Sequence, residues 1–431
     1  MKFYIHELGC AKNTDDVNHM TSLLIDKGYL PLEGPAGADY IIVHTCGFIE
    51  EAVKESLDAI LELADYKDLG CKSLIVSGCL SQRYQSSLER ELPEVDLFLG
   101  TSYSHRIDDY INKKGAYYDR VDFKLKSYQH REVSKNYEYL KIAEGCDNYC
   151  SYCIIPKLRG PMRSKTIEEL VQEATELSKR GAKELILIAQ DLSRYGQDRG
   201  QIKILELLRA LNQIPGINWI RLQYVYPDIL DEEFFTTMAG LDKVVAYLDM
   251  PIQHASDGVL KRMNRHTSQA DLRRVIELAR KIMPHIVLRS TVMVGFPGET
   301  DEDFRVLMDF IEEIKFDKLG AFKYSDEEEV ASHKLDGKVS EEVKEQRYEA
   351  IMALQMGISE DKLSTLQGQV LEVMVDEVYS DSWIGRTRGD SPDVDGIVYV
   401  EGNGVKVGDI LKVKIKTSSE YDLVGEPYEF S

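Results

Sequence analysis

The chain has 431 residues and a formal net charge of −21, from 53 Lys and Arg against 74 Asp and Glu. Its length suggests about three domains, at ~100–200 residues per domain. Hydrophobic residues make up 43% of the chain, enough for buried cores. No apolar run reaches the ~20 residues of a membrane helix, and the N-terminus does not read as a signal peptide, so we expect a cytoplasmic protein. The acidity disfavours nucleic acid as a partner unless a local basic patch exists.

Residues 1–100 alternate predicted strands and helices. The strands are Lys2–Glu7, Tyr40–Thr45 and Ser73–Ser77, and helical patterns cover Asp15–Gly28 and Ile49–Tyr66. This order predicts an open α/β domain with a parallel sheet.

A cysteine follows each of these three strands, namely Cys10, Cys46 and Cys79. The carboxyl ends of parallel strands share one edge of a sheet, so we expect the three thiols to converge there. The alternative is three independent buried thiols. The chain has seven cysteines, and an odd number in a cytoplasmic protein favours metal binding or catalysis over a disulfide framework. The seventh, Cys71, is expected to pack as a small apolar residue.

Residues 101–136 are polar and are interpreted as a connector. From 137 to 365, strands and amphipathic helices alternate with a repeat of roughly 30 residues. The predicted strands are Tyr139–Ala143, Glu184–Ala189, Trp219–Gln223, Ala246–Met250, Ile286–Val294 and Leu319–Tyr324. Helices such as Thr166–Arg180 and Ser268–Met283 lie between them, and 326–365 reads as charged and helical. The pattern predicts a partial, open (β/α)6 TIM-like barrel with its active site at the carboxyl ends of the strands.

The last segment, 366–431, changes to alternating strands at Val370–Glu377, Gly396–Val400 and Ile410–Thr417, separated by glycine turns. We expect a small antiparallel β-barrel. This segment carries 13 Asp and Glu against six Lys and Arg, a net charge of 6 − 13 = −7.

The strongest motif is Cys146-x-x-x-Cys150-x-x-Cys153, directly after the first predicted barrel strand. Thiolates are soft ligands that hold iron–sulfur clusters. Three cysteines fill three corners of a four-iron cluster and leave one iron open. Structural zinc would need a fourth local ligand, which the loop lacks, so zinc or a disulfide is the weaker interpretation.

With Tyr152 before its last cysteine, this loop resembles the radical S-adenosylmethionine (SAM) superfamily. The resemblance implies a cluster whose open iron binds SAM, and a 5′-deoxyadenosyl radical that removes hydrogen from a C–H bond. Candidate SAM contacts are Tyr152, the strand-end residues Gln190 and Asp191, Arg289 within a strand, and Gly295 and Glu299 of a glycine-rich turn. The turn could equally be a plain strand-to-helix connection, and the others could serve packing.

The whole chain resembles the methylthiotransferases, which have an N-terminal domain with three cysteines, a radical SAM barrel and a C-terminal TRAM β-barrel. The resemblance implies two 4Fe-4S clusters, with Cys10, Cys46 and Cys79 holding the auxiliary, sulfur-carrying one. It also implies SAM, a sulfur source, and an electron donor such as flavodoxin or ferredoxin.

One branch of this family modifies an adenosine of transfer RNA, and another modifies the β-carbon of an aspartate in small-subunit ribosomal protein twelve. The ribosomal branch is the closer match at segments 45–49 (TCGFI), 78–84 (GCLSQRY) and 250–257 (MPIQHASD). His44 departs from the Asn usual before Thr-Cys. The acidic last segment fits a basic protein substrate better than RNA, although it could be a mere spacer. A non-catalytic, cluster-bearing ribosome-assembly factor is the alternative from another class.

His254 ends a predicted strand and is expected to face the pocket, as a substrate contact or a cofactor-orienting group. A hydrogen-bonded structural histidine is the alternative, because sequence does not reveal its protonation state.

Overall fold

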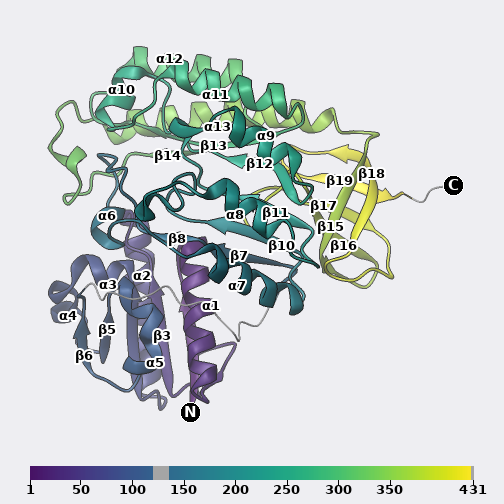
Figure 1. Ribbon diagram of the computed structural model, residues 1–431. Coiled ribbons are helices and arrows are strands. Elements are labelled where there is room, and N and C mark those ends of the chain that lie inside the picture. Colours follow the sequence, from purple (N-terminus) through teal and green to yellow (C-terminus); the bar gives the residue numbers. More distant parts are fainter. Residues whose placement is uncertain (120–134, 429–431) are drawn as a thin grey trace.

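The computed structural model describes residues 1–119 and 135–428. Three units follow one another along the chain, and Figure 1 shows them in purple-blue, teal-green and yellow. The first unit lies against the middle one, which carries the last unit at its other end.

The N-terminal unit is a six-stranded parallel sheet in the order β2-β1-β3-β4-β5-β6. Its strands are β1 (Lys2–Glu7), β2 (Leu30–Pro31), β3 (Tyr40–Thr45), β4 (Ser73–Gly78), β5 (Leu97–Leu99) and β6 (Gly115–Tyr117). Its helices are α1 (Ala11–Asp26), α2 (Glu50–Ala64), α3 (Cys79–Tyr84), α4 (Ser86–Glu91) and α5 (Ile107–Tyr110). Strands β3 and β4 are buried at every position, as expected for central strands covered by helices on both faces.

The segment interpreted as a connector is partly structured. Residues 101–119 form a 3-10 helix (Thr101–Arg106), α5 and β6, and β6 pairs with β5 to complete the N-terminal sheet. The polar composition hid these short elements because β6 lies at the sheet edge, where little of it is buried. The rest of the predicted connector includes 120–134, which lies outside the described residues.

The middle unit is an open half-barrel of six parallel strands in the order β14-β13-β12-β11-β10-β7. Apart from a short β8 (Ala143–Glu144) and β9 (Arg163–Ser164) hairpin, consecutive strands are neighbours, as predicted for a TIM-like barrel. The six strands are β7 (Tyr137–Lys141), β10 (Glu184–Ile188), β11 (Trp219–Leu222), β12 (Val244–Asp249), β13 (Val287–Val294) and β14 (Lys318–Lys323).

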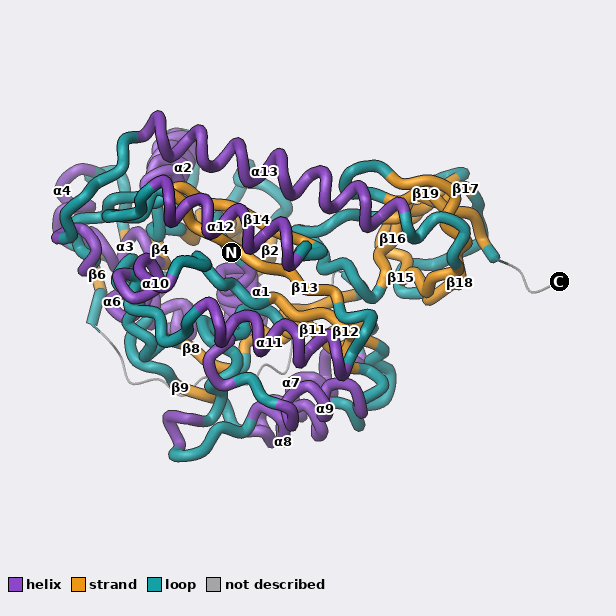
Figure 2. The backbone as a smooth tube through the Cα atoms, turned by 90° about the horizontal axis from the view of Figure 1, so that it is seen from above, coloured by secondary structure: helices purple, strands orange, loops and turns teal. Residues whose placement is uncertain are grey.

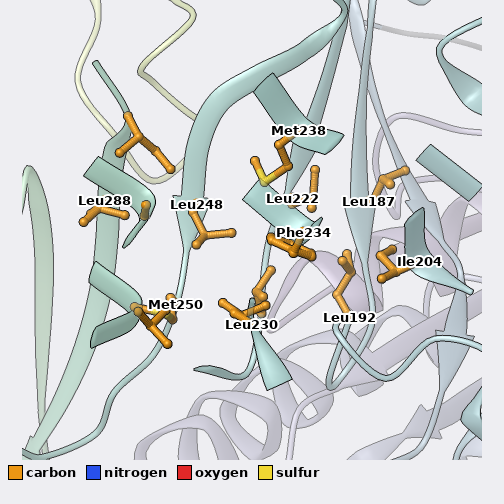
Figure 3. Close-up of a cluster of buried hydrophobic side chains, with 14 of the residues drawn as sticks. Leu187, Leu192, Ile204, Leu222, Leu230, Phe234, Met238, Leu248, Met250 and Leu288 are labelled. Carbon is orange, nitrogen blue, oxygen red and sulfur yellow. The ribbon is translucent and has the colours of Figure 1, made fainter. Parts of the chain in front are cut away.

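Helices cover the outside of this half-barrel. They are α7 (Ile167–Lys179), α8 (Ile204–Leu211), α9 (Glu232–Gly240), α10 (Asp257–Arg262), α11 (Gln269–Ile282) and α12 (Asp301–Ile314), whereas the short α6 (Ile155–Leu158) packs against α3 of the N-terminal unit. Capping boxes begin α7 at Thr166, α11 at Ser268 and α12 at Thr300, and the first two helices start within one residue of their predicted beginnings. The core between strands and helices is aliphatic, and Figure 3 shows Leu187, Leu222 and Leu248 meeting Phe234 and Met238.

The long helix α13 (Glu341–Ser364) runs beside α12 and leads to the C-terminal unit, as Figure 2 shows. That unit is a closed five-stranded barrel, β15-β16-β17-β19-β18. Its strands are β15 (Val370–Val378), β16 (Ser382–Thr387), β17 (Val398–Glu401), β18 (Ile410–Ser418) and β19 (Leu423–Pro427). β16 and β19 were not among the predicted strands.

Buried polar contacts join the C-terminal barrel to the half-barrel. Glu184 at the start of β10 pairs with Arg221 at 2.7 Å and with Arg386 at 2.8 Å. Tyr247 donates to Asp395 in the β16–β17 loop at 2.8 Å. Since β10 and β11 begin here, the C-terminal unit closes the amino end of the strands and leaves their carboxyl ends for the site. Among the described residues, no helix is long and apolar enough to cross a membrane.

Candidate active site: two facing sets of cysteines

The local cysteine set lies in the loop between β8 and α6, at the carboxyl end of the first half-barrel strand. Both neighbouring strand-end residues predicted to contact SAM hold this loop in place. Gln190 accepts a hydrogen bond from the Gly145 N–H at 2.8 Å, and Asp191 accepts one from the Asn148 side chain at 2.7 Å. Gln190 and Asp191 therefore fix the position of the loop in this structure.

The dispersed set comes together as the sheet topology predicts. Cys10 precedes α1, Cys46 follows β3, and Cys79 begins α3 directly after β4. A Cβ atom added to Gly9 would lie 2.9 Å from the Cβ of Cys46. One added to Gly47 would lie 3.0 Å from the carbonyl carbon of Cys79. The three turns are thus in contact, and both glycines are needed because a side chain would separate the turns.

The two sets face each other across the boundary between the first two units. Cys79 packs in one apolar cluster with Ile154 and Leu158, and Ile154 directly follows Cys153. The positive charge of Lys12 acts on Cys10 from the dispersed set and on Cys153 from the local set. The fold therefore brings together six cysteines from four separate segments of the chain.

The surroundings of the buried cysteines in both sets favour the protonated thiol over the thiolate. Burial raises the pKa of Cys79, Cys146 and Cys153 to about 12, and Arg159 opposes this effect at Cys79. Backbone N–H groups counteract burial too, from Phe48 at Cys46 and from Asn148 at Cys146. A metal that binds here must displace these protons, and the N–H groups would then stabilise the sulfur charge.

The spacing of the sulfur atoms discriminates between possible metals. Among the described residues, the only three possible ligand atoms within 4.8 Å of one another come from Asp16, His105 and Glu144. A single zinc ion would hold its thiolates about 3.8 Å apart, given ~2.3 Å bonds and tetrahedral angles. Neither cysteine set is that closed, so neither is preformed for a single zinc ion.

Arg159 connects the two sets through side chains. Its guanidinium lies 3.8 Å from the Cys79 sulfur and donates to Asn13 at 2.9 Å, to Asp16 at 3.1 Å and to Glu144 at 2.7 Å. Glu144 precedes the local cysteine loop and also accepts from Gln190 at 3.4 Å. The result is a chain of polar contacts that runs from Cys79 to the beginning of the other loop.

This contact chain belongs to a larger buried ionic network between α1 and the half-barrel. Lys141 is completely buried and pairs with Asp16, with Glu144 at 2.9 Å and with Asp15 at 3.5 Å. Its ammonium pairs with Asp16 and Glu144, the two carboxylates of the group that they form with His105, so a lysine already supplies positive charge there. The ions of Lys141 and Arg159 hold the pKa of Asp16 well below its usual range and lower that of Glu144 to about 2, against the opposing effect of burial.

Two further residues that were predicted to contact SAM, Arg289 and Tyr152, contact other side chains of the protein. Arg289 pairs with Asp249 at 2.9 Å and lies 3.6 Å from Asp395 of the C-terminal unit. Tyr152 is partly buried beside Phe296, and its hydroxyl lies 3.5 Å from Arg265. Burial raises the pKa of Tyr152 well above its usual range, against the effect of Arg265. Their roles toward SAM stay predictions.

The glycine-rich turn after β13 packs on α13. Gly295 has a φ of +73° and a Cβ there would lie 2.2 Å from the Cγ of Lys344, so the glycine admits that side chain. Glu299 accepts from the Phe296 N–H at 3.0 Å and pairs with Arg347 at 2.9 Å. Burial raises the pKa of Glu299 to about 7, although Arg347 opposes the rise.

His254 follows β12, and its role toward substrate or cofactor stays a prediction. Its side chain is completely buried, and its Nδ1 accepts from the Ser256 N–H at 2.9 Å. Its Nε2 lies 3.9 Å from Glu299. Burial lowers the pKa of His254 to about 4. The burial of the ring and its hydrogen bond to the Ser256 N–H agree with the alternative of a structural histidine.

A cavity of about 570 Å³ opens beside Cys10 where all three units meet. Cys10 and Tyr224 line its inner part, and the carboxylates of Glu7, Glu138 and Asp393 also line it. Sequence reasoning did not find this cavity, nor Lys12 and Arg159, because no motif links residues that only the fold places beside the cysteines.

Comparisons with known proteins agree with the three units. The Radical SAM superfamily matches residues 140–311, the uncharacterized protein family UPF0004 matches 2–100, and the TRAM domain matches 368–427. Among solved structures, the radical SAM methyltransferase TsrM from Kitasatospora setae aligns with a TM-score of 0.58 at 16% identity, over 75% of this chain and 74% of that one. OxsB, a cobalamin-dependent SAM radical enzyme, aligns with a TM-score of 0.51 at 11% identity, over 82% and 56% of the two chains. At these identities the likeness concerns the fold.

Curated relatives match nearly the whole chain. Ribosomal protein uS12 methylthiotransferase RimO from Clostridioides difficile is 43% identical over 99% of this chain and 98% of its own length. The protein of the same name from Geotalea uraniireducens is 45% identical over 99% and 98%. Identity at this level over both full lengths, together with the three units in the same order, shows the family: the chain belongs to the RimO methylthiotransferases.

Proposed function

We propose that this protein is a radical SAM methylthiotransferase that replaces a hydrogen on the β-carbon of an aspartate in ribosomal protein uS12 with a methylthio group. One observation carries the proposal. Two sets of three cysteines, one local and one assembled from three strand ends, pack against each other through Cys79 and Ile154. A single-cluster radical enzyme would have no use for the second set.

The donor chemistry of both sets fits iron–sulfur clusters. Cys146, Cys150 and Cys153 would hold the cluster that binds SAM, and Cys10, Cys46 and Cys79 would hold the auxiliary one. When bound, SAM would supply the radical that removes hydrogen and the methyl group, the first cluster would supply the electron that cleaves SAM, and the auxiliary cluster would supply the sulfur. The contacts of Gln190, Asp191, Gly295 and Glu299 would then support the SAM pocket from behind.

The side chains of the protein position the two cluster sites relative to each other and enclose the space between them. Arg159 and Glu144 fix the dispersed turns relative to the local loop, so the two cluster sites keep one separation. Ile154 and Leu158 cover Cys79 and keep water from the space between the sets. Exclusion of water matters here because a carbon radical reacts with whatever it meets first.

A protein substrate suits the entrance better than RNA does. The cavity beside Cys10 is lined by three carboxylates, of Glu7, Glu138 and Asp393, against one lysine, Lys135, and the segment from 366 to 431 has a net charge of 6 − 13 = −7. These charges attract a basic ribosomal protein and repel phosphates. The curated relatives are named for the same substrate, uS12. The reaction would take place in the cytoplasm with a flavodoxin- or ferredoxin-like reductant and an external sulfur source.

An anaerobic assay tests the proposal. The protein is reconstituted with iron and sulfide and incubated with SAM, reductant and an equimolar mixture of uS12 and transfer RNA. Mass spectrometry should find one methylthio group on an aspartate of uS12 and none on RNA. Modified adenosine would assign the protein to the RNA branch. Absence of 5′-deoxyadenosine under all conditions would instead favour a non-catalytic assembly factor.

A further inference from the structure

Lys12 is a buried lysine without a polar partner. It lies in the first turn of α1, two residues after Cys10, and its side chain is only 8% exposed. Its ammonium lies 2.8 Å from the centroid of the Tyr224 ring. Within residues 1–119 and 135–428, no carboxylate or other acceptor forms a hydrogen bond or ion pair with it.

The other buried lysines show that this is unusual. Lys141 pairs with three carboxylates, Lys165 pairs with Glu173 at 2.7 Å, and Lys344 pairs with Glu341 at 2.5 Å. Burial of an ammonium without an anion is costly, and a ring face compensates only part of that cost. The three N–H donors of Lys12 therefore lack the carboxylate acceptor that the other three buried lysines have.

The position of Lys12 in α1 adds to this demand for an anion. The N-terminal turn of a helix carries partial positive charge, which repels a lysine and attracts a carboxylate. The nearby Asp249 is already engaged, because it pairs with Arg289 at 2.9 Å and accepts from the Tyr224 N–H at 3.0 Å. An additional anion is needed to satisfy Lys12.

The surroundings of Lys12 place that anion at the reaction centre. Its charge acts on Cys10 and on Cys153, one cysteine from each set. Cys10 and Tyr224, both next to Lys12, line the cavity of about 570 Å³. A ligand in this cavity would lie against Cys10 and against Tyr224, the residue whose ring the Lys12 ammonium contacts.

We propose that Lys12 binds the side-chain carboxylate of the target residue and so selects aspartate as the substrate. This inference rests on the proposed function. The carboxylate of an aspartate is bonded directly to its β-carbon, so a salt bridge to Lys12 would hold that carbon beside Cys10 and between the two cysteine sets. Asparagine and a nucleobase lack the charge and would leave the buried ammonium unpaired.

The test combines a change in the enzyme with a change in the substrate. Lys12→Met keeps the length of the side chain and removes its charge, and Lys72→Met is the matched control. Lys72 is an exposed lysine at the amino end of β4, at the opposite edge of the same sheet. Each enzyme is reconstituted anaerobically and its Kd is measured for uS12 and for uS12 with asparagine at the target position.

The native enzyme and the Lys72→Met control should bind the aspartate form at least about 30-fold more tightly than the asparagine form, as expected when one partner of a desolvated charge pair is lost. Lys12→Met should bind both forms equally, while its iron content, its affinity for SAM without uS12 and its electron paramagnetic resonance spectrum remain native.

Three results would overturn the assignment. Lys12→Met could preserve the preference for aspartate, it could weaken SAM binding in the absence of uS12, or it could lose iron from the dispersed set. The last two would assign Lys12 to SAM or to the cluster. Failure of the proposed function is a separate result, because the native enzyme would then leave uS12 unmodified. Binding of asparagine-substituted uS12 to the native enzyme tests the preference for aspartate without any substitution in the enzyme.

Discussion

The two cysteine sets reach similar arrangements by different routes. The local set needs eight consecutive residues of one loop, braced by Gln190 and Asp191. The dispersed set needs three strand ends in the correct order, and it lies against the buried network of Arg159, Lys141 and Asp16. The local set can therefore be recognised from the sequence motif alone. The dispersed set forms only if the N-terminal sheet is folded and packed against the half-barrel.

Removal of one cysteine from each set should give the largest effects and should separate the two roles. Cys146→Ser should abolish both 5′-deoxyadenosine and methylthiolated uS12, because SAM would lose its cluster. Cys79→Ser should keep 5′-deoxyadenosine but form no methylthiolated product. Both compounds are quantified by chromatography and mass spectrometry. Cys71, a buried cysteine of the same sheet outside both sets, provides the control as Cys71→Ser. Loss of SAM cleavage in Cys79→Ser would contradict separate roles.

Arg159→Met should destabilise the protein by about 3–5 kcal/mol, because it leaves Asp16 and Glu144 with less positive charge in a buried site. Denaturant unfolding measures the change. The dispersed set should lose more iron than the local one, since only Cys79 lies beside the guanidinium. The exposed Arg305 is the control, and Arg305→Met should change stability by less than about 0.5 kcal/mol. Equal effects of the two substitutions would show that the network is not structural.

A fall in pH should lower the free energy of unfolding through His105, which lies in the buried network beside the dispersed set. Burial lowers the pKa of His105 to about 3, with Lys141 acting in the same direction. The unfolded chain binds a proton near pH 6.5 and the folded one does not. Stability is therefore complete above pH 6.5 and declines as the pH falls toward 3, by about 1.4 kcal/mol per unit for this group. His105→Asn should reduce the loss in unfolding free energy between pH 7 and pH 5, and an unchanged loss would exclude His105 as its source.

The smallest effect on activity is expected from loss of the hydrogen bond between Gln190 and the local cysteine loop. Gln190→Met removes the acceptor for the Gly145 N–H and should slow 5′-deoxyadenosine formation about tenfold, the equivalent of one backbone hydrogen bond. Iron content should stay native, since all six cysteines remain. A rate equal to that of the native enzyme would mean that the loop holds its position without Gln190.

The sequence predicted the architecture well where its patterns are local. All six strands of the half-barrel and the three strands that precede Cys10, Cys46 and Cys79 overlap the apolar runs that predicted them, and the predicted helices Thr166–Arg180 and Ser268–Met283 are α7 and α11. β6 was not predicted because little of this edge strand is buried, and β19 was not predicted because it has only five residues, Gly425 and Pro427 among them.

The environment of the site was less accessible to sequence reasoning. His254 was expected at a pocket and is completely buried, since sequence places a residue at a strand end but does not orient it. Lys12 and Arg159 follow no spacing rule, and only the packing of α1 and α6 against the cysteine turns brings them there.

We expect the two sets to hold two separate four-iron clusters. Mössbauer spectroscopy with iron quantification tests it in two triple serine variants, one without Cys10, Cys46 and Cys79 and the other without Cys146, Cys150 and Cys153. Each variant should retain about half of the native iron as one intact four-iron cluster. Retention of all the iron by either variant, or its loss from both, would contradict the account.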